Sequence, residues 1–186
     1  MNSSKLKVLV ACEYSGIVRD AFIARGHDAM SCDLLPTDVK GPHYQGDVFD
    51  IIDDGWDLLC AFPPCTHLCS SGARWWKDKK QEQEDAIKFV LALYNCNIPK
   101  VDIENPVGIL STVWRKPDCI VQPYEHGHGE TKKTCLWLKN LPKLLPSNPV
   151  SGREQKVWKC PPGPNRWKIR SKTYQGIANC MANTWG

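Results

Sequence analysis

Residues 5–26, "KLKVLVACEYSGIVRDAFIARG", decide the fold of this 186-residue chain. Residues 5–12 form a short apolar run, which predicts a buried strand. Residues 15–26 then show helical spacing and end at Gly26, a residue favoured just past a helix end. The apolar positions of this helix are Ile17, Val18, Ala21, Phe22 and Ala24. A buried strand followed at once by a helix indicates an α/β fold.

The rest of the chain repeats this alternation. Further strands are predicted at residues 27–35, 55–62, 98–106 and 133–141, and further helices at residues 80–95 and 173–186. Strands that alternate with helices favour a mainly parallel, Rossmann-like sheet with helices on both faces. We expect a core at residues 1–138, a small lobe or loop at residues 139–172, and a C-terminal helix at residues 173–186 that returns to the core.

The composition is that of a chain able to bury a core, with 42% hydrophobic and 24% charged residues. No apolar run approaches the roughly 20 residues of a membrane span, and the first residues are too polar for a signal peptide. We therefore expect a cytoplasmic protein that does not enter a membrane. The ten cysteines are expected to be thiols there, and no two lie at C-x-x-C spacing, which weakens a structural zinc interpretation.

Charge is distributed unevenly. Residues 1–110 carry 11 Lys and Arg against 16 Asp and Glu, whereas residues 111–186 carry 13 against 4. Residues 139–172, which we call the basic segment, hold nine basic residues against the single Glu154, together with two tryptophans. This composition is typical of a surface that binds a phosphate backbone, although a solvated basic face remains an alternative. The candidate nucleic-acid contacts here are Arg153, Arg166, Lys168 and Arg170.

Ligands of open α/β sheets bind at the carboxyl ends of the strands. A glycine-containing turn at residues 11–16 follows the first predicted strand, and Asp33 ends the second. This arrangement is typical of a nucleoside site, in which Asp33 would bind the ribose hydroxyls and Asp47 an adenine amino group.

The stretch "CAFPPCTHLC" at residues 60–69 places Cys65 behind two prolines that cannot extend a sheet. We expect its thiol to be displayed at the mouth of the site. The polar loop that follows, residues 66–76, would serve as a flap in which Arg74 and Trp75 meet phosphate or base. Two alternatives stay open: an inert core cysteine, and a zinc site of Cys60, Cys65, Cys69 and His67.

Glu104 follows the apolar strand at residues 98–106. Burial there would raise the pKa of its carboxyl group and make it a proton donor near neutral pH. The alternative is an exposed Glu104 beside an Asn105 that caps a helix.

In order and spacing these motifs resemble the cytosine-5 methyltransferases that use S-adenosylmethionine. The family's Pro-Cys motif matches Pro64 and Cys65, with Gly72 and Arg74 downstream, and its Glu-Asn motif matches Glu104 and Asn105. Residues 46–48 match a Gly-Asp-hydrophobic motif, and "QGIANCMA" at residues 175–182 is similar to the last motif.

The resemblance implies a Rossmann-like methyltransferase that methylates carbon 5 of cytosine in DNA, most simply double-stranded DNA, with no metal. The catalytic residues it implies are Cys65, Glu104, Arg74 and Lys132. The cofactor residues that we expect are Glu13, Tyr14, Ser15, Gly16, Asp33, Asp47, Pro63 and Asn179. The same chemistry on RNA or a free nucleotide, and a non-catalytic nucleic-acid-binding protein, are the alternatives.

Two of the departures from the family pattern concern the cofactor turn and the region that reads the target sequence. Tyr14 and Ile17 occupy positions where the first motif usually has glycine, and only Gly16 matches. The long variable region before the last motif is replaced by the basic segment. The basic segment is too small for extensive base readout, so we expect a short or relaxed sequence preference. The resemblance further implies a bacteriophage origin, because compact members of this kind are typical of bacteriophage genomes.

Overall fold

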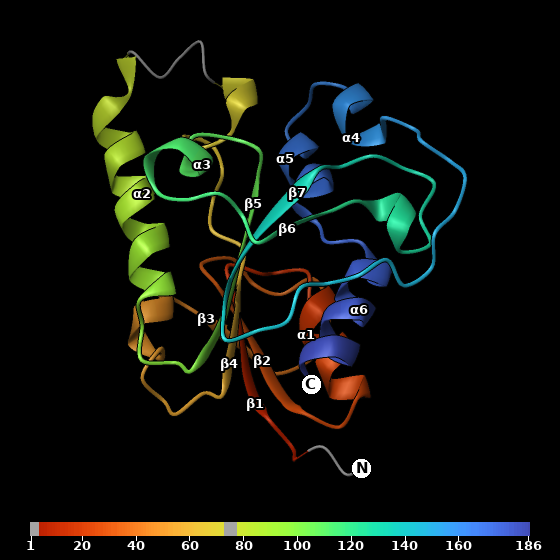
Figure 1. The fold of residues 1–186 in the computed structure, drawn as a ribbon. Coiled ribbons are helices and arrows are strands. Elements are labelled where there is room, and N and C mark those ends of the chain that lie inside the picture. Colours follow the sequence, from red (N-terminus) through yellow and green to blue (C-terminus); the bar gives the residue numbers. More distant parts are fainter. Residues whose placement is uncertain (1–3, 73–77) are drawn as a thin grey trace.

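The computed structural model describes residues 4–72 and 78–186 (Figure 1). Within these ranges the chain forms a seven-stranded sheet in the order β3-β2-β1-β4-β5-β7-β6. The strands are β1 (Lys7–Ala11), β2 (Asp28–Asp33), β3 (His43–Gln45), β4 (Leu58–Ala61), β5 (Lys100–Pro106), β6 (Cys119–Val121) and β7 (Thr134–Lys139).

Helices cover both faces of this sheet. In Figure 1, α1 and α6 lie on one face and α2 lies on the other. The α-helices are α1 (Ile17–Ala24), α2 (Lys80–Tyr94), α3 (Leu110–Val113), α4 (Lys156–Lys159), α5 (Arg166–Ser171) and α6 (Gln175–Trp185), and the short 3-10 turns are η1 (Val48–Asp50) and η3 (Pro123–Glu125). The predicted fold class, a Rossmann-like sheet with helices on both faces, is confirmed.

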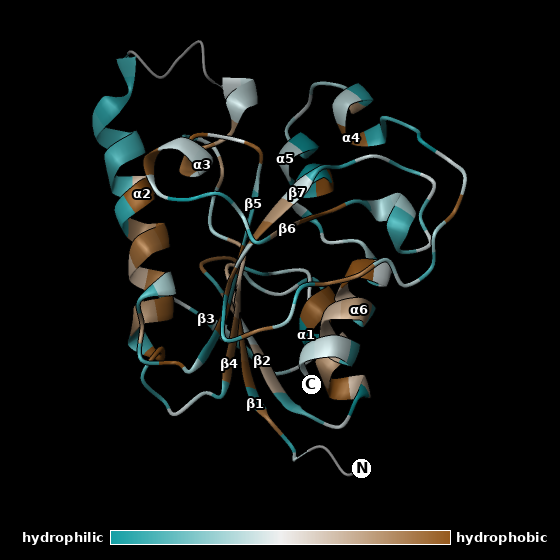
Figure 2. Cartoon of the chain, viewed as in Figure 1, coloured by the Kyte–Doolittle hydropathy of each residue, from teal (hydrophilic) through white to brown (hydrophobic). Residues whose placement is uncertain are grey.

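The apolar run of the first strand is explained by two cores. Val8 and Val10 pack under α1 and α6, whereas Leu9 and Ala11 pack on the opposite face with α2. Successive side chains of a strand point to opposite faces, so a strand buried on both faces has no polar alternation. Figure 2 shows the complementary pattern on α2, whose hydrophilic N-terminal turns extend past the sheet and whose hydrophobic C-terminal turns pack on it.

The sheet differs from the prediction at one edge. The pairs from β3 through β5 are parallel, but β7 runs antiparallel to both β5 and β6. Two short strands, β3 and β6, were not predicted. Each has only three residues, which is too short for a strand pattern to be recognised in the sequence.

The basic segment is only partly a separate lobe. Leu144 is buried in the core that α6 also lines, and the Trp185 indole donates to the Pro142 carbonyl at 2.9 Å. The beginning of the segment is therefore part of the core. Its second half forms α4 and α5, which Figure 1 places beyond the carboxyl edge of the sheet. No helix in the described ranges has both the length and the apolar character needed to cross a bilayer.

Candidate active site

The carboxyl ends of the parallel strands surround a cavity of about 160 Å³. Its walls are Cys12, Cys32, Asp33, Leu34, Gly46, Asp47, Val48, Pro64 and Phe89. A second, smaller cavity shares Cys12 and is lined by Glu13, Tyr14, Ser15, Phe62, Ser171, Lys172 and Thr173. We call the two cavities together the groove. Five of the predicted cofactor residues line it: Glu13, Tyr14, Ser15, Asp33 and Asp47.

Asp33 and Asp47 are both oriented by the backbone. Asp33 accepts a hydrogen bond from the Leu35 amide at 2.9 Å, and Asp47 accepts one from the Phe49 amide at 3.0 Å, which caps η1. Each bond uses Oδ1, and in the described chain the second oxygen of each carboxylate has no hydrogen bond. Burial raises the pKa of Asp33. The wide end of the groove therefore presents two fixed acceptors beside apolar walls, which suits a ribose and a base.

Glu13 occupies the narrow end of the groove and is only 5% exposed. Its Oε1 accepts bonds from the Ser15 hydroxyl and, at 2.9 Å, from the Ile17 amide. Its Oε2 is buried and has no partner among the described residues. Burial raises the pKa of this carboxyl group, opposed mainly by the Ser15 hydrogen bond. A buried acceptor without a partner is costly, so this end is suited to a ligand that brings a donor such as an ammonium group.

Gly16 is required by the turn that leads into α1. It has φ 76°, and a Cβ there would lie 2.5 Å from both Arg19 Nη2 and Val39 Cγ2. Gly41 faces the same guanidinium, and its Cβ would lie 2.6 Å from Arg19 Cζ. The two glycines therefore make room for an arginine that is fully buried.

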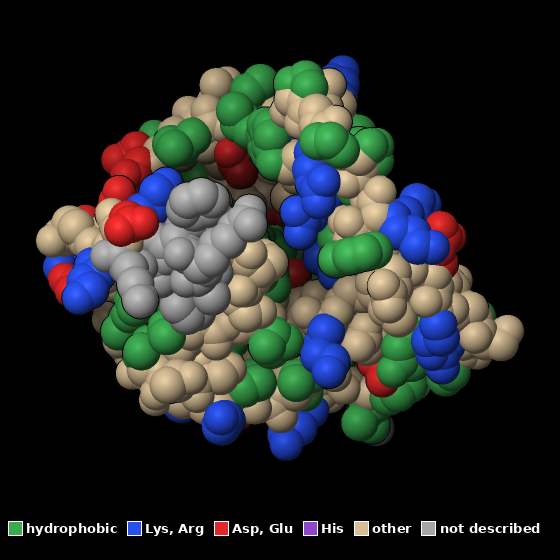
Figure 3. Space-filling view, turned by 90° about the horizontal axis from the view of Figure 1, so that it is seen from above, with side chains coloured by type: hydrophobic (Ala, Val, Ile, Leu, Met, Phe, Trp, Pro, Cys, Tyr) green, Lys and Arg blue, Asp and Glu red, His purple; other side chains and the backbone are tan. Residues whose placement is uncertain are grey.

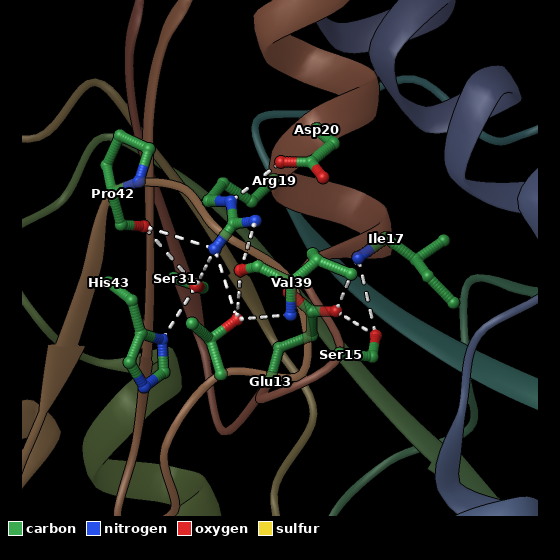
Figure 4. A network of polar contacts seen from close by, with 10 residues as sticks. Glu13, Ser15, Ile17, Arg19, Asp20, Ser31, Val39, Pro42 and His43 are labelled. Atoms are coloured by element: carbon green, nitrogen blue, oxygen red, sulfur yellow. Dashed lines mark hydrogen bonds and ion pairs between the residues drawn. The ribbon is translucent and has the colours of Figure 1, made fainter.

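Arg19 on α1 joins this helix to β2 and to the loop that follows β2 (Figure 4). Its guanidinium pairs with Asp20 at 2.8 Å and donates to Ser31 Oγ at 3.1 Å and to the Val39 carbonyl at 3.4 Å. A buried charge is tolerated only when it is paired and hydrogen-bonded, and Arg19 meets this condition. The loop after β2 begins at Leu34, which lines the groove, so Arg19 supports one wall of the groove. Sequence reasoning missed this residue, since nothing local distinguishes it from a surface arginine of an amphipathic helix.

The Pro-Pro-Cys turn is tied to the end of β5. Asn105 is 1% exposed, and its side-chain amide donates to the Pro63 carbonyl at 3.0 Å. Asn105 therefore does not cap a helix, and the alternative that placed Glu104 on an exposed helix start is wrong. The bond fixes the turn that carries Cys65 next to the strand end that carries Glu104.

Cys65 is half-buried. Its carbonyl accepts from the amides of Leu68 and Cys69 at 3.0 and 2.9 Å, so the chain turns immediately after it. Burial raises the pKa of this thiol, and the neighbouring Cys69 and Glu104 raise it further.

Glu104 and Lys132 are the other two predicted catalytic residues that the structure describes, and we call them together with Cys65 the catalytic group. Burial raises the pKa of the Glu104 carboxyl, whereas the Lys132 ammonium opposes the rise in both Glu104 and Cys65. Lys132 Nζ also donates to the Lys172 carbonyl at 3.3 Å. Three of the four predicted catalytic residues thus share one electrostatic environment. The fourth, Arg74, and the neighbouring Trp75 lie outside the described residues.

Cys60 does not belong to this group. It is fully buried in β4 and packs in the core under α1 and α6, as Val10 does on the neighbouring strand. It cannot join Cys65 and Cys69 around a zinc ion. Across residues 4–72 and 78–186, no three His, Cys, Asp or Glu side chains are placed to hold a metal.

Two expected cofactor residues lie elsewhere. Asn179 is exposed on α6 and accepts a hydrogen bond from Gln175 at 2.9 Å, because the helix turns Ala178 and Met181 into the core. It is not among the residues that line the groove, and its role in cofactor binding stays a prediction. Pro63 is buried with its carbonyl engaged by Asn105, and the following Pro64 lines the cavity in its place.

Four of the predicted nucleic-acid contacts, Arg153, Arg166, Lys168 and Arg170, lie among the described residues. Figure 3, seen from above, shows Lys and Arg side chains along one side of a hollow that contains acidic side chains. Arg166, Lys168 and Arg170 are half-buried on α5, and Trp158 on α4 is 75% exposed. Arg153 lies 3.5 Å above the Tyr124 ring and donates to the Val150 carbonyl, so it is partly held by the protein itself.

The sheet order 3-2-1-4-5-7-6 with an antiparallel β7 is typical of Rossmann-like methyltransferases that use S-adenosylmethionine. A comparison with family models and one with curated proteins both return no match. Among solved structures the fold is similar to the Entamoeba histolytica methyltransferase EhMeth, with a TM-score of 0.54 and 12% sequence identity. The match covers 80% of this chain and 58% of EhMeth, so the chain spans little more than half of that protein. At this identity the likeness concerns the fold.

Proposed function

We propose that this protein transfers a methyl group from S-adenosylmethionine to carbon 5 of cytosine in DNA, through a covalent adduct with Cys65. The observation that carries the proposal is the Asn105–Pro63 hydrogen bond. It ties the turn that carries the Cys65 thiol to the end of β5 that carries the Glu104 carboxyl group, and Pro64 of the same turn lines the groove.

The groove fits the cofactor at both ends. Asp33 and Asp47 would hold the ribose and adenine, with Val48 and Phe89 as apolar walls. The unpartnered oxygen of Glu13 would accept from the amino group of the methionine moiety. When bound, S-adenosylmethionine supplies an electrophilic methyl group on a sulfonium.

The side chains at the mouth supply the remaining chemistry. The Cys65 thiolate attacks carbon 6 of cytosine while Glu104 gives its proton to ring nitrogen 3, so that carbon 5 becomes nucleophilic. After carbon 5 has gained the methyl group, it loses its proton to a base and the bond from sulfur to carbon 6 breaks. Nitrogen 3 returns its proton to Glu104, which restores the starting state. The raised pKa of Glu104 supports its role as the proton donor.

The basic segment supports a polynucleotide substrate. α5 carries three cations beside the groove, and exposed tryptophans lie on α4 and α5. A free cytosine nucleotide would need no such surface. In duplex DNA the target base has to leave the stack before it reaches Cys65.

Transfer of radiolabelled methyl groups tests the proposal. The wild-type protein and Cys65→Ala would be incubated with labelled S-adenosylmethionine and duplex DNA, single-stranded DNA, RNA or dCTP, followed by nucleoside analysis. We expect label in 5-methylcytosine of DNA with the wild type only, and unchanged DNA binding by Cys65→Ala. Label found in RNA alone or in dCTP alone would show that this molecule, and not DNA, is the methyl acceptor. Activity retained by Cys65→Ala would overturn the covalent mechanism.

A further inference from the structure

Residues 168–173, which we call the strap, belong to two surfaces at once. Ser171, Lys172 and Thr173 form one wall of the groove, opposite Glu13 and Ser15. The strap begins within α5, the helix that carries the candidate phosphate contacts. The strap therefore borders both the proposed cofactor site and the proposed nucleic-acid surface.

The first anchor of the strap is Tyr14, which stands where the resembling family usually has glycine. Its hydroxyl donates to the Lys168 carbonyl at 3.1 Å and lies 3.1 Å from Ser171 Oγ. Its ring lies 5.8 Å from that of Trp167, and Lys168 Nζ lies 5.7 Å above it. A glycine at this position would make none of these contacts.

Lys172 provides two further anchors. Its ammonium pairs with Asp38 at 2.7 Å, and Asp38 donates its own amide to the Tyr14 carbonyl at 2.8 Å. The Lys172 carbonyl accepts a hydrogen bond from Lys132, and the charge of Lys132 lowers the pKa of both Cys65 and Glu104. The strap is thus fixed to the turn after β1, to the loop after β2 and to the catalytic group.

We infer that binding of the cofactor and binding of the nucleic acid are positively coupled through the strap, and that Tyr14 is the positioning residue for this coupling. This inference rests on the proposed function. A ligand in the groove contacts residues 171–173 and favours the docked strap. Phosphates held by Arg166, Lys168 and Arg170 favour the same docked arrangement of α5.

The sign of the coupling, and its equality in both directions, follow from thermodynamic linkage. We call the strap docked when its contacts with Tyr14, Asp38 and Lys132 are formed. On this inference each ligand binds the protein with the docked strap more tightly, so the first ligand removes part of the free-energy cost of ordering the strap for the second. The coupling factor must be the same whichever ligand binds first. We expect a factor of about ten, within the usual range for coupled sites.

Isothermal titration calorimetry of the full chain tests this inference. The Kd of S-adenosylhomocysteine would be measured without DNA and with a saturating cytosine-containing duplex, and the Kd of the duplex with and without S-adenosylhomocysteine. We expect both ratios to be about ten in the wild type. In Tyr14→Phe, which keeps the ring and removes the hydroxyl bonds, both ratios should fall toward one.

Tyr94→Phe is the matched control. Its hydroxyl also donates to a backbone carbonyl, that of Leu138, but on the α2 side of the sheet. Its two ratios should equal those of the wild type. Ratios near one in the wild type, alongside measurable methyl transfer, would overturn the coupling and leave the proposed function standing. Absence of S-adenosylhomocysteine binding would overturn both.

Discussion

The groove and the basic segment are built by opposite means. The walls of the groove are supported by buried polar side chains: Arg19 joins α1 to β2 and the loop after it, and Asn105 joins β5 to the turn of Cys65. The second half of the basic segment consists of two short helices whose large apolar side chains, Trp158 and Ile169, are more than half exposed. Chemistry that depends on the distance between reacting atoms belongs on the fixed part.

The difference separates two kinds of mutational effect. Changes in the groove and at its mouth should alter the rate of the chemical step, the stability of the fold or its pH dependence. Changes in the basic segment should alter affinity for nucleic acid and its dependence on salt, because phosphate contacts are individually weak and screened.

Glu104→Gln should give the largest effect. Glutamine keeps the size of the side chain but cannot deliver a proton, so we expect kcat to fall by about 10²- to 10⁴-fold. Affinity for duplex DNA, measured by fluorescence anisotropy, should stay within about twofold of the wild type. A loss of DNA affinity as large as the loss of rate would place Glu104 in substrate binding instead.

Arg19→Met tests what fixes the groove. The change leaves the buried Ser31 hydroxyl without its guanidinium donor and removes the ion pair with Asp20, which should cost on the order of 3 kcal/mol. For a chain of this length that corresponds to a fall in Tm of roughly 6–12 °C. Thermal unfolding followed by circular dichroism measures the shift.

Arg25→Met is the matched control, because Arg25 is exposed at the end of the same helix. Its stability should stay within about 0.5 kcal/mol of the wild type. Equal losses in the two variants would mean that the buried network contributes nothing specific.

Lys132→Met should displace the pH profile. The Lys132 charge lowers the pKa of both Cys65 and Glu104, so its removal raises both. Ionisation of the thiol and deprotonation of the acid then both need a higher pH. We therefore expect both limbs of the pH profile of kcat/KM to move toward alkaline pH. The control is Lys133→Met, which changes the exposed neighbouring lysine and should leave the pH profile unchanged. A shift toward acidic pH would contradict this electrostatic assignment.

Arg170→Ala should give the smallest effect. Loss of one phosphate contact should weaken DNA binding several-fold and reduce the slope of log Kd against log salt concentration by about one. Lys5→Ala removes an exposed cation near the N-terminus and should leave the slope unchanged. An Arg170→Ala variant with the slope of the wild type would remove α5 from the nucleic-acid surface.

Sequence reasoning predicted the parts of the fold that depend on local patterns. The apolar run of β1 and the helical spacing of α1 indicated the α/β class. The rule that ligands bind at the carboxyl edge predicted a site around Asp33, Cys65 and Glu104, of which Asp33 lines the groove. The reversal of β7 followed from no local signal, because strand direction depends on the connection that leads into it. The bonds of Arg19 link residues far apart in sequence, and the rotation of α6 that exposes Asn179 is set by packing against α1.

Covalent trapping tests the central claim most directly. In a duplex where 5-fluorocytosine replaces cytosine on one strand, carbon 5 cannot lose a proton, so an adduct with Cys65 should accumulate when S-adenosylmethionine is present. We predict an intact mass equal to protein plus strand plus one methyl group, located on the peptide that contains Cys65, and no adduct with Cys65→Ala. Production of 5-methylcytosine from ordinary duplex without any such adduct, or an adduct on another residue, would contradict the account.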